Sequence, residues 1–289
     1  MPAPFRLGRR TFTAADLAVM AIVNRTPDSF FDKGATFAPD AALEAVARAI
    51  EAGADIIDIG GVKAGPGAEV DTDEELRRTI PTIAAVRERY PDVVISIDTW
   101  RAAVAREAVA AGADLLNDTW AGADPALAEV AAETGAAIVC SHAGGLNPRT
   151  RPHRVAFDDV VADVVATVTG LAERALSLGV RRDGILIDPA HDFGKNTRHS
   201  LELTRRLDEL AATGWPVLVA LSNKDFVGET LDAPVDARLS GTLAATAVSA
   251  WLGAQVFRAH QVRETRQVLD MVASVRGDRP PAVARRGLA

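Results

Sequence analysis

Carboxylate and amide side chains stand directly after short apolar runs along this chain, in positions suited to ligand recognition. Asp98, Asn117 and Asp188 offer acceptor oxygens that suit a heterocycle bearing N–H donors. Any one of them could instead cap a loop or a solvated turn. The same pattern after eight separate runs is harder to explain in that way. The polar residues at these positions are Asn24, Asp58, Asp98, Asn117, Asp118, His142, Asp188, Ser222, Lys224, Arg258 and His260.

A cationic or potentially cationic group follows the last two apolar runs. It consists of Lys224, Arg258 and His260. The stretch 222–224 also precedes a possible helical turn, whose free backbone N–H groups attract anions. Together with the acceptor groups, this pattern predicts a polar, planar ligand that carries a phosphate-type group.

The elements that must position these residues repeat along the chain. Apolar runs of this length indicate strands buried on both faces, as in a parallel sheet. Helical stretches separate them, including 40–52, 74–90, 101–111 and 262–275. The runs are 19–24, 56–61, 93–99, 115–118, 137–142, 185–189, 217–222 and 256–260.

Eight such units fit either a closed (β/α)₈ barrel or a doubly wound open sheet. The count of eight favours the barrel, and no Gly-x-Gly-x-x-Gly fingerprint follows the first run. Barrels place functional residues at the carboxyl ends of their strands and often bind phosphate after the last two. We therefore expect an N-terminal segment 1–17, one α/β TIM-barrel domain 18–276 and a flexible C-terminal tail 277–289.

Composition limits the other possibilities. The chain has 289 residues, 48% hydrophobic and 25% charged, which is ordinary for one globular barrel domain. The net charge of −7 gives no sign of a nucleic-acid partner. Neither a membrane span nor a signal peptide is recognisable, so a cytoplasmic location is expected. Cys140 lies in an apolar run, which predicts an inert core thiol, and the spacing of the histidines matches no metal signature.

A series of motifs resembles the dihydropteroate synthase family, in that family's order, from about residue 18 to about residue 275. The first is Met20-Ala-Ile-Val-Asn-Arg-Thr-Pro-Asp-Ser-Phe-Phe-Asp-Lys-Gly34. The others are Asp58-Ile-Gly-Gly61, Ser96-Ile-Asp-Thr99, Asn117-Asp118, Asp188-Pro189, Phe193-Gly-Lys195, Ser222-Asn-Lys224 and Phe257-Arg-Ala-His260. The ordered set is much more specific than any one motif.

The resemblance implies an alkyl transfer in folate biosynthesis. It condenses 6-hydroxymethyl-7,8-dihydropterin pyrophosphate with 4-aminobenzoate and releases pyrophosphate, with Mg²⁺ as cofactor and a homodimer as the assembly. By position, the catalytic residues would be Asn24, Lys224, Arg258 and His260, with Asn24 as the Mg²⁺ ligand. The pterin would be bound by Asp98, Asn117, Asp188, Lys224 and Arg258. The aminobenzoate would lie near Pro66, Phe193 and Ser222, with its carboxylate at the helix start after the seventh strand.

The chain departs from the family's pattern mainly where the second substrate would bind. The usual Gly-Gly-Glu-Ser-Thr-Arg-Pro-Gly is Gly60-Gly-Val-Lys-Ala-Gly-Pro-Gly67, and the usual Ser-Arg-Lys is Ser222-Asn-Lys224. The usual His-Met-Arg-Gly is His142-Ala-Gly-Gly145, and Ala-His-Asp-Phe-Gly-Lys at 190–195 replaces Gly-Ile-Gly-Phe-Gly-Lys. Losing one charged hydrogen bond costs roughly 1.5–3 kcal/mol, or roughly ten- to hundred-fold in rate.

Three hypotheses follow from these departures. The chain is an active synthase with an altered loop, or a weak or inactive paralogue that binds a pterin-like ligand, as in the divergent second synthase copy of actinobacteria. A methyltetrahydrofolate-dependent methyltransferase is disfavoured, because Arg258 and His260 keep the pyrophosphate pattern and there is no corrinoid-binding domain.

Overall fold

The computed structural model describes residues 4–26, 36–150 and 156–287. Their central element is an eight-stranded parallel sheet in the order β8-β7-β6-β5-β4-β3-β10-β9, and a bridge from Ile187 to Val217 joins its two edges. The predicted (β/α)₈ barrel is therefore confirmed. The strands are β3 (Ala18–Asn24), β4 (Ile56–Gly60), β5 (Val94–Asp98), β6 (Leu115–Asp118), β7 (Ala137–Ser141), β8 (Ile185–Asp188), β9 (Leu218–Ala220) and β10 (Val256–Ala259).

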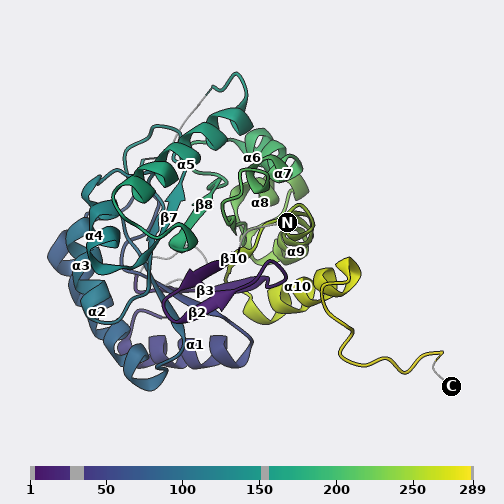
Figure 1. The fold of residues 1–289 in the computed structure, drawn as a ribbon, viewed down its shortest axis with the longest axis horizontal. Helices are drawn as coiled ribbons and strands as arrows, with labels where there is room; N and C mark the ends of the chain where they lie inside the picture. Colours follow the sequence, from purple (N-terminus) through teal and green to yellow (C-terminus); the bar gives the residue numbers. More distant parts are fainter. Residues whose placement is uncertain (1–3, 27–35, 151–155, 288–289) are drawn as a thin grey trace.

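Helices surround these strands (Figure 1). Alternate strand residues such as Ile57 and Ile59 face outwards and pack against the helices. The helices are α1 (Pro39–Glu51), α2 (Thr72–Arg89), α3 (Ala102–Ala110), α4 (Ala126–Thr134), α5 (Val160–Ser177), α6 (Thr197–Arg205), α7 (Leu207–Ala211), α8 (Asp225–Leu231), α9 (Leu239–Trp251) and α10 (Val262–Arg276). Two 3₁₀ turns, η1 (Arg182–Gly184) and η2 (Val235–Ala237), lie between them.

A short hairpin closes the amino-terminal end of the barrel. Its strands are β1 (Phe5–Leu7) and β2 (Arg10–Phe12), within the predicted segment 1–17. The rings of Phe5 and Phe12 stack with centroids 4.7 Å apart. They share a buried apolar cluster with the first inward-facing residues of the barrel strands, among them Ala18, Ile56 and Val94. The lower half of the interior is thus lined by apolar side chains, and the polar groups of the interior lie towards the opposite end.

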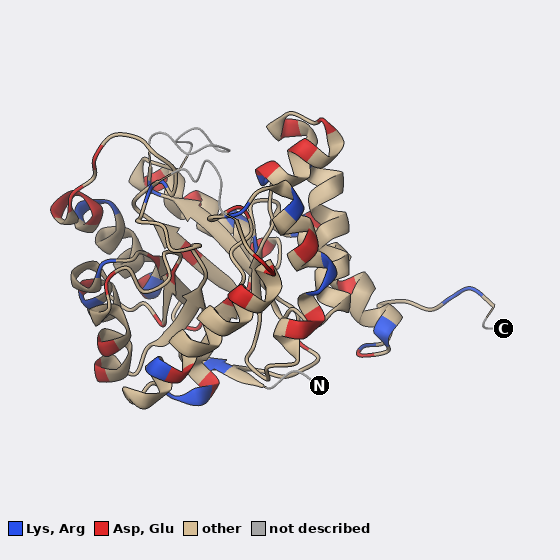
Figure 2. Cartoon of the chain, turned by 90° about the horizontal axis from the view of Figure 1, so that it is seen from above, with Lys and Arg blue, Asp and Glu red and all other residues tan. Residues whose placement is uncertain are grey.

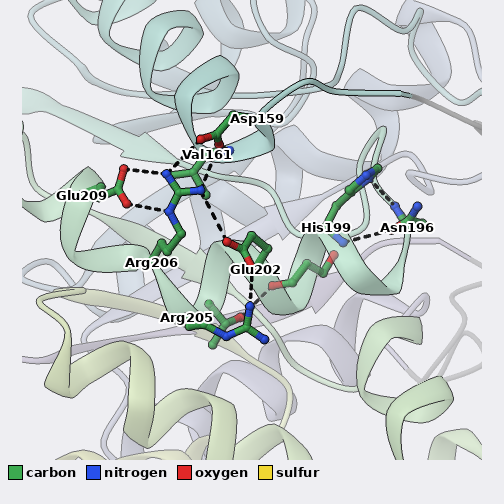
Figure 3. A network of polar contacts seen from close by, with 10 residues as sticks. Asp159, Val161, Asn196, His199, Glu202, Arg205, Arg206 and Glu209 are labelled. Atoms are coloured by element: carbon green, nitrogen blue, oxygen red, sulfur yellow. Dashed lines mark hydrogen bonds and ion pairs between the residues drawn. The ribbon is translucent and has the colours of Figure 1, made fainter.

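Charged residues are distributed over the outer helices, with basic and acidic positions interspersed (Figure 2). One surface network is extensive (Figure 3). Arg206, between α6 and α7, donates to Asp159 at 3.0 and 3.1 Å and also bonds Glu202 and Glu209. Asp159 caps the start of α5, so this network fixes α5 to the α6–α7 corner.

The segment after α10 is exposed from Asp278 to Gly287 and extends away from the barrel (Figure 1). Its flexibility, and the domain bounds 18–276, remain predictions. No helix within the described residues is both long enough and apolar enough to cross a membrane.

Candidate functional site

An ion-paired cluster lies inside the upper half of the barrel. Arg258 donates through Nε to Asp58 Oδ2 at 2.6 Å and through Nη2 to Asp98 Oδ2 at 2.7 Å. Asp58 and Asp98 occupy inward positions of neighbouring strands β4 and β5, one inward position above Ile56 of the apolar floor and two above Val94, respectively. The strand register thus brings together residues that are up to 200 positions apart in the chain.

Asp58 is fully buried and bonded on several sides. Besides Arg258, it accepts from Ser96 Oγ at 2.6 Å and from Asn117 Nδ2 at 3.2 Å. The other end of that amide, Asn117 Oδ1, is buried without a hydrogen-bond partner in the described structure. An unpaired buried acceptor is costly, and a ligand N–H donor would satisfy it.

Burial is the largest cause of the raised pKa values of Asp98 and Asp188. It raises the pKa of Asp98 to about 7, although the Arg258 charge opposes the shift, and Asp58 adds to it. Burial also raises the pKa of Asp188, against the opposing charge of Lys224. Asp188 Oδ1 accepts from the backbone N–H of Ala190 at 2.7 Å. Both carboxyls are therefore sensitive to a ligand that supplies N–H donors.

Lys224 lies on the opposite side from the acidic cluster. Its Nζ donates to the His191 carbonyl and lies 5.0 Å from the centroid of the Phe193 ring. Trp120 contacts that ring edge-on at 5.1 Å. Burial lowers the pKa of Lys224, while Asp192 and Asp188 oppose the shift. An amine held this close to an aromatic ring and two carboxyls can donate to a ligand carbonyl.

Ser222 and His260 form a second polar group at the ends of β9 and β10. Ser222 Oγ lies 2.9 Å from His260 Nδ1 and 3.2 Å from Gln261 Oε1. Burial and the nearby Arg258 charge lower the pKa of His260 to about 3. His260, which the sequence marked as potentially cationic, is therefore neutral near pH 7, and it can offer a hydrogen bond to an anion.

Asn223 stands where the family usually has an arginine, and it bonds within the protein through its Nδ2 and its backbone N–H, while its buried Oδ1 has no hydrogen-bond partner in the described structure. Its Nδ2 donates to Gln261 Oε1 at 3.2 Å, and its backbone N–H donates to Thr242 at 3.1 Å. Its φ of +57° is in the left-handed region, which asparagine tolerates better than most residues. This position is a buried turn and supplies no cation.

The β8–α6 loop is built around a buried lysine that sequence reasoning did not place in the site. Lys195 Nζ lies 2.7 Å from His142 Nδ1 and donates to the carbonyls of Phe193 and Ala190 at 2.7 and 3.1 Å. Burial, with help from the Lys224 charge, lowers its pKa to about 7. Only glycine fits at position 194, because a Cβ there would lie 2.6 Å from the Ala143 carbonyl oxygen. Lys195 thus fixes the loop that carries Phe193.

The remaining predicted residues lie at the rim. Pro66 is exposed on the loop between β4 and α2, and the Asn24 carbonyl accepts from Thr36 Oγ1 at 2.6 Å. Most of the first motif, at 27–34, lies outside the described residues. At the start of α8, the backbone N–H of Phe226 is already bonded within the protein, because it donates to Asp192 Oδ2 at 3.1 Å.

The structure joins Asp98, Asn117 and Arg258 through Asp58, which sequence reasoning had placed at a strand end without a role. The signal for Asp58 was available, since it is the only charged residue in the run Ile56-Ile-Asp-Ile59. The structure also joins Ser222 to His260 and Lys224 to Phe193. Within the described parts of the chain, no group of three or more His, Cys, Asp or Glu could hold a metal ion by itself.

This fold and site match a known family. Residues 20–260 match the family model described as pterin binding enzyme, and the chain belongs to that family. A Mycobacterium leprae relative named inactive dihydropteroate synthase 2 is 61% identical over 275 residues, which cover 94% of each chain. The Escherichia coli dihydropteroate synthase is 39% identical over 267 residues, covering 90% of this chain and 93% of the relative.

A solved structure agrees with this assignment. The Yersinia pestis dihydropteroate synthase, solved with a sulfonamide drug complex, superimposes with a TM-score of 0.90 at 36% identity. The match covers 96% of this chain and all of that one. The Mycobacterium leprae relative confirms the predicted resemblance to a second, divergent synthase copy, and the relatives include proteins named as synthases and proteins named as inactive.

The raised pKa of Asp98 predicts a pH-dependent contribution to stability. The unfolded carboxyl ionises near 3.8, whereas the folded one keeps its proton up to about 7. The folded state binds the extra proton between these values, so the contribution is fully present below 3.8 and is lost as the pH rises through about 7. We expect the free energy of unfolding of the wild type, relative to Asp98→Asn, to fall over this range in urea titrations. A difference between the two proteins that is independent of pH would contradict this assignment.

Proposed function

We propose that the chain binds 6-hydroxymethyl-7,8-dihydropterin pyrophosphate at the mouth of the barrel and transfers its pterin-methyl group only weakly to 4-aminobenzoate. The unpaired, buried Asn117 Oδ1 beside the Asp58–Arg258–Asp98 cluster is the observation that carries the proposal. The site offers acceptors on one side and a lysine on the other, as a pterin ring requires.

Each contact has a chemical reason. Asp188 and Asn117 Oδ1 would accept from the amino and N–H groups of the ring, while Lys224 would donate to its carbonyl. The guanidinium of Arg258 is oriented by two carboxylates, so its planar face is available to lie against the ring. Asp98 would complete the acceptor edge.

The transfer step requires the departing pyrophosphate to be stabilised. The C–O bond to the pterin methyl group breaks, the electron pair leaves with pyrophosphate, and the amine nitrogen forms the new C–N bond and releases a proton to water. Neutral His260 would donate a hydrogen bond to the departing pyrophosphate.

Magnesium binding is part of the same proposal. A bound Mg²⁺ would neutralise pyrophosphate charge, which is the chemistry it supplies in such sites. Asn24 ends β3 at an inward position, and its amide oxygen is the hard donor that this ion prefers. Mg²⁺ usually takes one or two protein ligands together with phosphate oxygens and water, so a single side chain fits.

Transfer of the pterin-methyl group to 4-aminobenzoate would be weak because two positions near this second substrate lack the cation that the family usually has. Asn223 is bonded to Gln261 and supplies no cation, and Gly65 replaces the arginine of the second-strand loop. The discriminating assay mixes protein, Mg²⁺, the pterin pyrophosphate and 4-aminobenzoate, then measures dihydropteroate and pyrophosphate. Pterin binding with slow turnover is expected, and rapid turnover would show a fully active synthase.

Homodimer formation is a further proposal, supported by exposed apolar side chains on the last two helices. Trp251 of α9 is 59% exposed and Met271 of α10 is 65% exposed, while Val248 and Val275 lie on the same helices. Such side chains suit an interface between two copies. The cytoplasmic location expected from the sequence remains a prediction.

Substitution of Asp188 directly tests the proposed binding of the pterin pyrophosphate. We expect Asp188→Asn to weaken binding of the pterin pyrophosphate by roughly tenfold to a hundredfold in calorimetry, because one charged acceptor is lost. Asp183→Asn, on the surface, serves as the control and should bind like the wild type. Unchanged affinity of Asp188→Asn would remove this residue from the site.

Placing a cation at Gly65 tests the explanation for the weak reaction with 4-aminobenzoate. A side chain fits there, because the nearest atom to a Cβ is Lys63 Cε at 3.9 Å and the backbone is not left-handed. We expect Gly65→Arg to raise kcat/KM for 4-aminobenzoate by about tenfold, from one charged hydrogen bond. Gly65→Leu controls for bulk, and an equal gain with leucine would refute the electrostatic explanation.

The dimer proposal predicts that Trp251→Glu yields monomers in sedimentation velocity at micromolar concentration. A buried interface cannot accommodate an unpaired carboxylate. Leu178→Glu, which adds the same charge at the end of α5, should remain dimeric. A monomeric wild type would end this part of the proposal.

A further inference from the structure

Asp192 carries a feature that the pterin site does not explain. Its φ is +67°, in the left-handed region where glycine is the usual residue, and Ala190 two positions earlier has φ +49°. Aspartate tolerates this conformation better than most residues, so it is the contacts of the Asp192 side chain that indicate whether it has a role. The carboxylate lies on the same loop as Phe193, next to the region expected to accept the second substrate.

The contacts of Asp192 hold its carboxylate in a defined place. Oδ2 accepts from the Phe226 N–H at 3.1 Å, and Oδ1 accepts from Ser200 Oγ at 2.9 Å. These bonds connect the loop to α8 and α6, and burial raises the pKa of Asp192 while Lys224 opposes the shift. The carboxyl is therefore a fixed, partly buried acidic group.

The cations described near Phe193 and Ser222 are already engaged. Lys224 donates to the His191 carbonyl and faces Asp188 and Asp192. Lys195 donates to backbone carbonyls of its own loop. Arg238 bonds Asp225 and the Asn223 carbonyl, each at 2.9 Å. An incoming carboxylate would have to displace one of these bonds and approach a fixed acidic group.

We infer that the second-substrate region selects an uncharged aromatic amine over one that bears a carboxylate, and that Asp192 sets this preference. The inference rests on the proposed function, since it names the amine acceptor of that site. The amine nitrogen would form the C–N bond to the pterin methyl carbon as the C–O bond breaks, pyrophosphate would leave with the electron pair, and the amine proton would pass to water. The two rings would contact Phe193 in the same way, so only the charge differs.

Binding of two matched amines tests the inference without requiring turnover. Protein saturated with Mg²⁺ and the pterin pyrophosphate is titrated with 4-aminobenzamide and with 4-aminobenzoate, which differ little in shape and by one charge. We expect the amide to bind about tenfold more tightly, as one unfavourable charged contact implies. Equal binding, tighter binding of the carboxylate, or no binding of either amine would overturn the inference. Failure of the pterin pyrophosphate itself to bind, seen in its own titration, would instead refute the proposed function.

Two variants identify Asp192 as the cause. Asp192→Asn keeps the size and an acceptor oxygen, and it should shift the affinity ratio towards the carboxylate by about tenfold. Ser200→Ala removes the two hydrogen bonds that the Ser200 hydroxyl makes with Asp192, without changing the charge of Asp192, and it should leave the ratio as in the wild type. A ratio that changes with Ser200→Ala and not with Asp192→Asn would show that loop structure, not charge, sets the preference. Urea titrations confirm that both variants are folded.

Discussion

The pairing of Arg258 with Asp58 and Asp98 is the interaction on which the site depends. Two carboxyls inside a barrel are tolerable only when a cation and further donors compensate them. Arg258 from the last barrel strand, with Ser96 and Asn117, supplies these donors. The apolar floor below, closed by the hairpin, keeps water out of the lower interior and forces the polar groups to the carboxyl ends of the strands. The site is therefore complete only when the barrel is closed.

Much of the fold was predictable because a parallel strand buried on both faces leaves a distinct apolar run. The observed strands agree with the predicted ones to within one or two residues, as β6 (Leu115–Asp118) and β8 (Ile185–Asp188) show. The hairpin at the barrel's amino end was not predicted, because Phe5 and Phe12 form part of a run too short to show a period. Its function depends on closing a space that exists only after eight strands have come together.

Most residues of the site could be predicted from the sequence, but the contacts between them could not. Positions after strand ends identified Asp98, Asn117 and Arg258, but their link through Asp58 depends on strand neighbours that a single sequence does not give. The lowered pKa values of His260 and Lys195 also arise from tertiary burial. Local spacing carries information about residue type and chain direction, whereas desolvation depends on everything packed around a group.

A crystal structure with the pterin pyrophosphate and Mg²⁺ would test the central claim most directly. We predict that the amino edge of the ring lies within hydrogen-bond distance of Asn117 Oδ1 and Asp188, while Arg258 keeps its bonds to Asp58 and Asp98 and lies against the ring face. Ligand density away from the strand ends, or a ring bound with Asn117 Oδ1 still unpaired, would contradict the account.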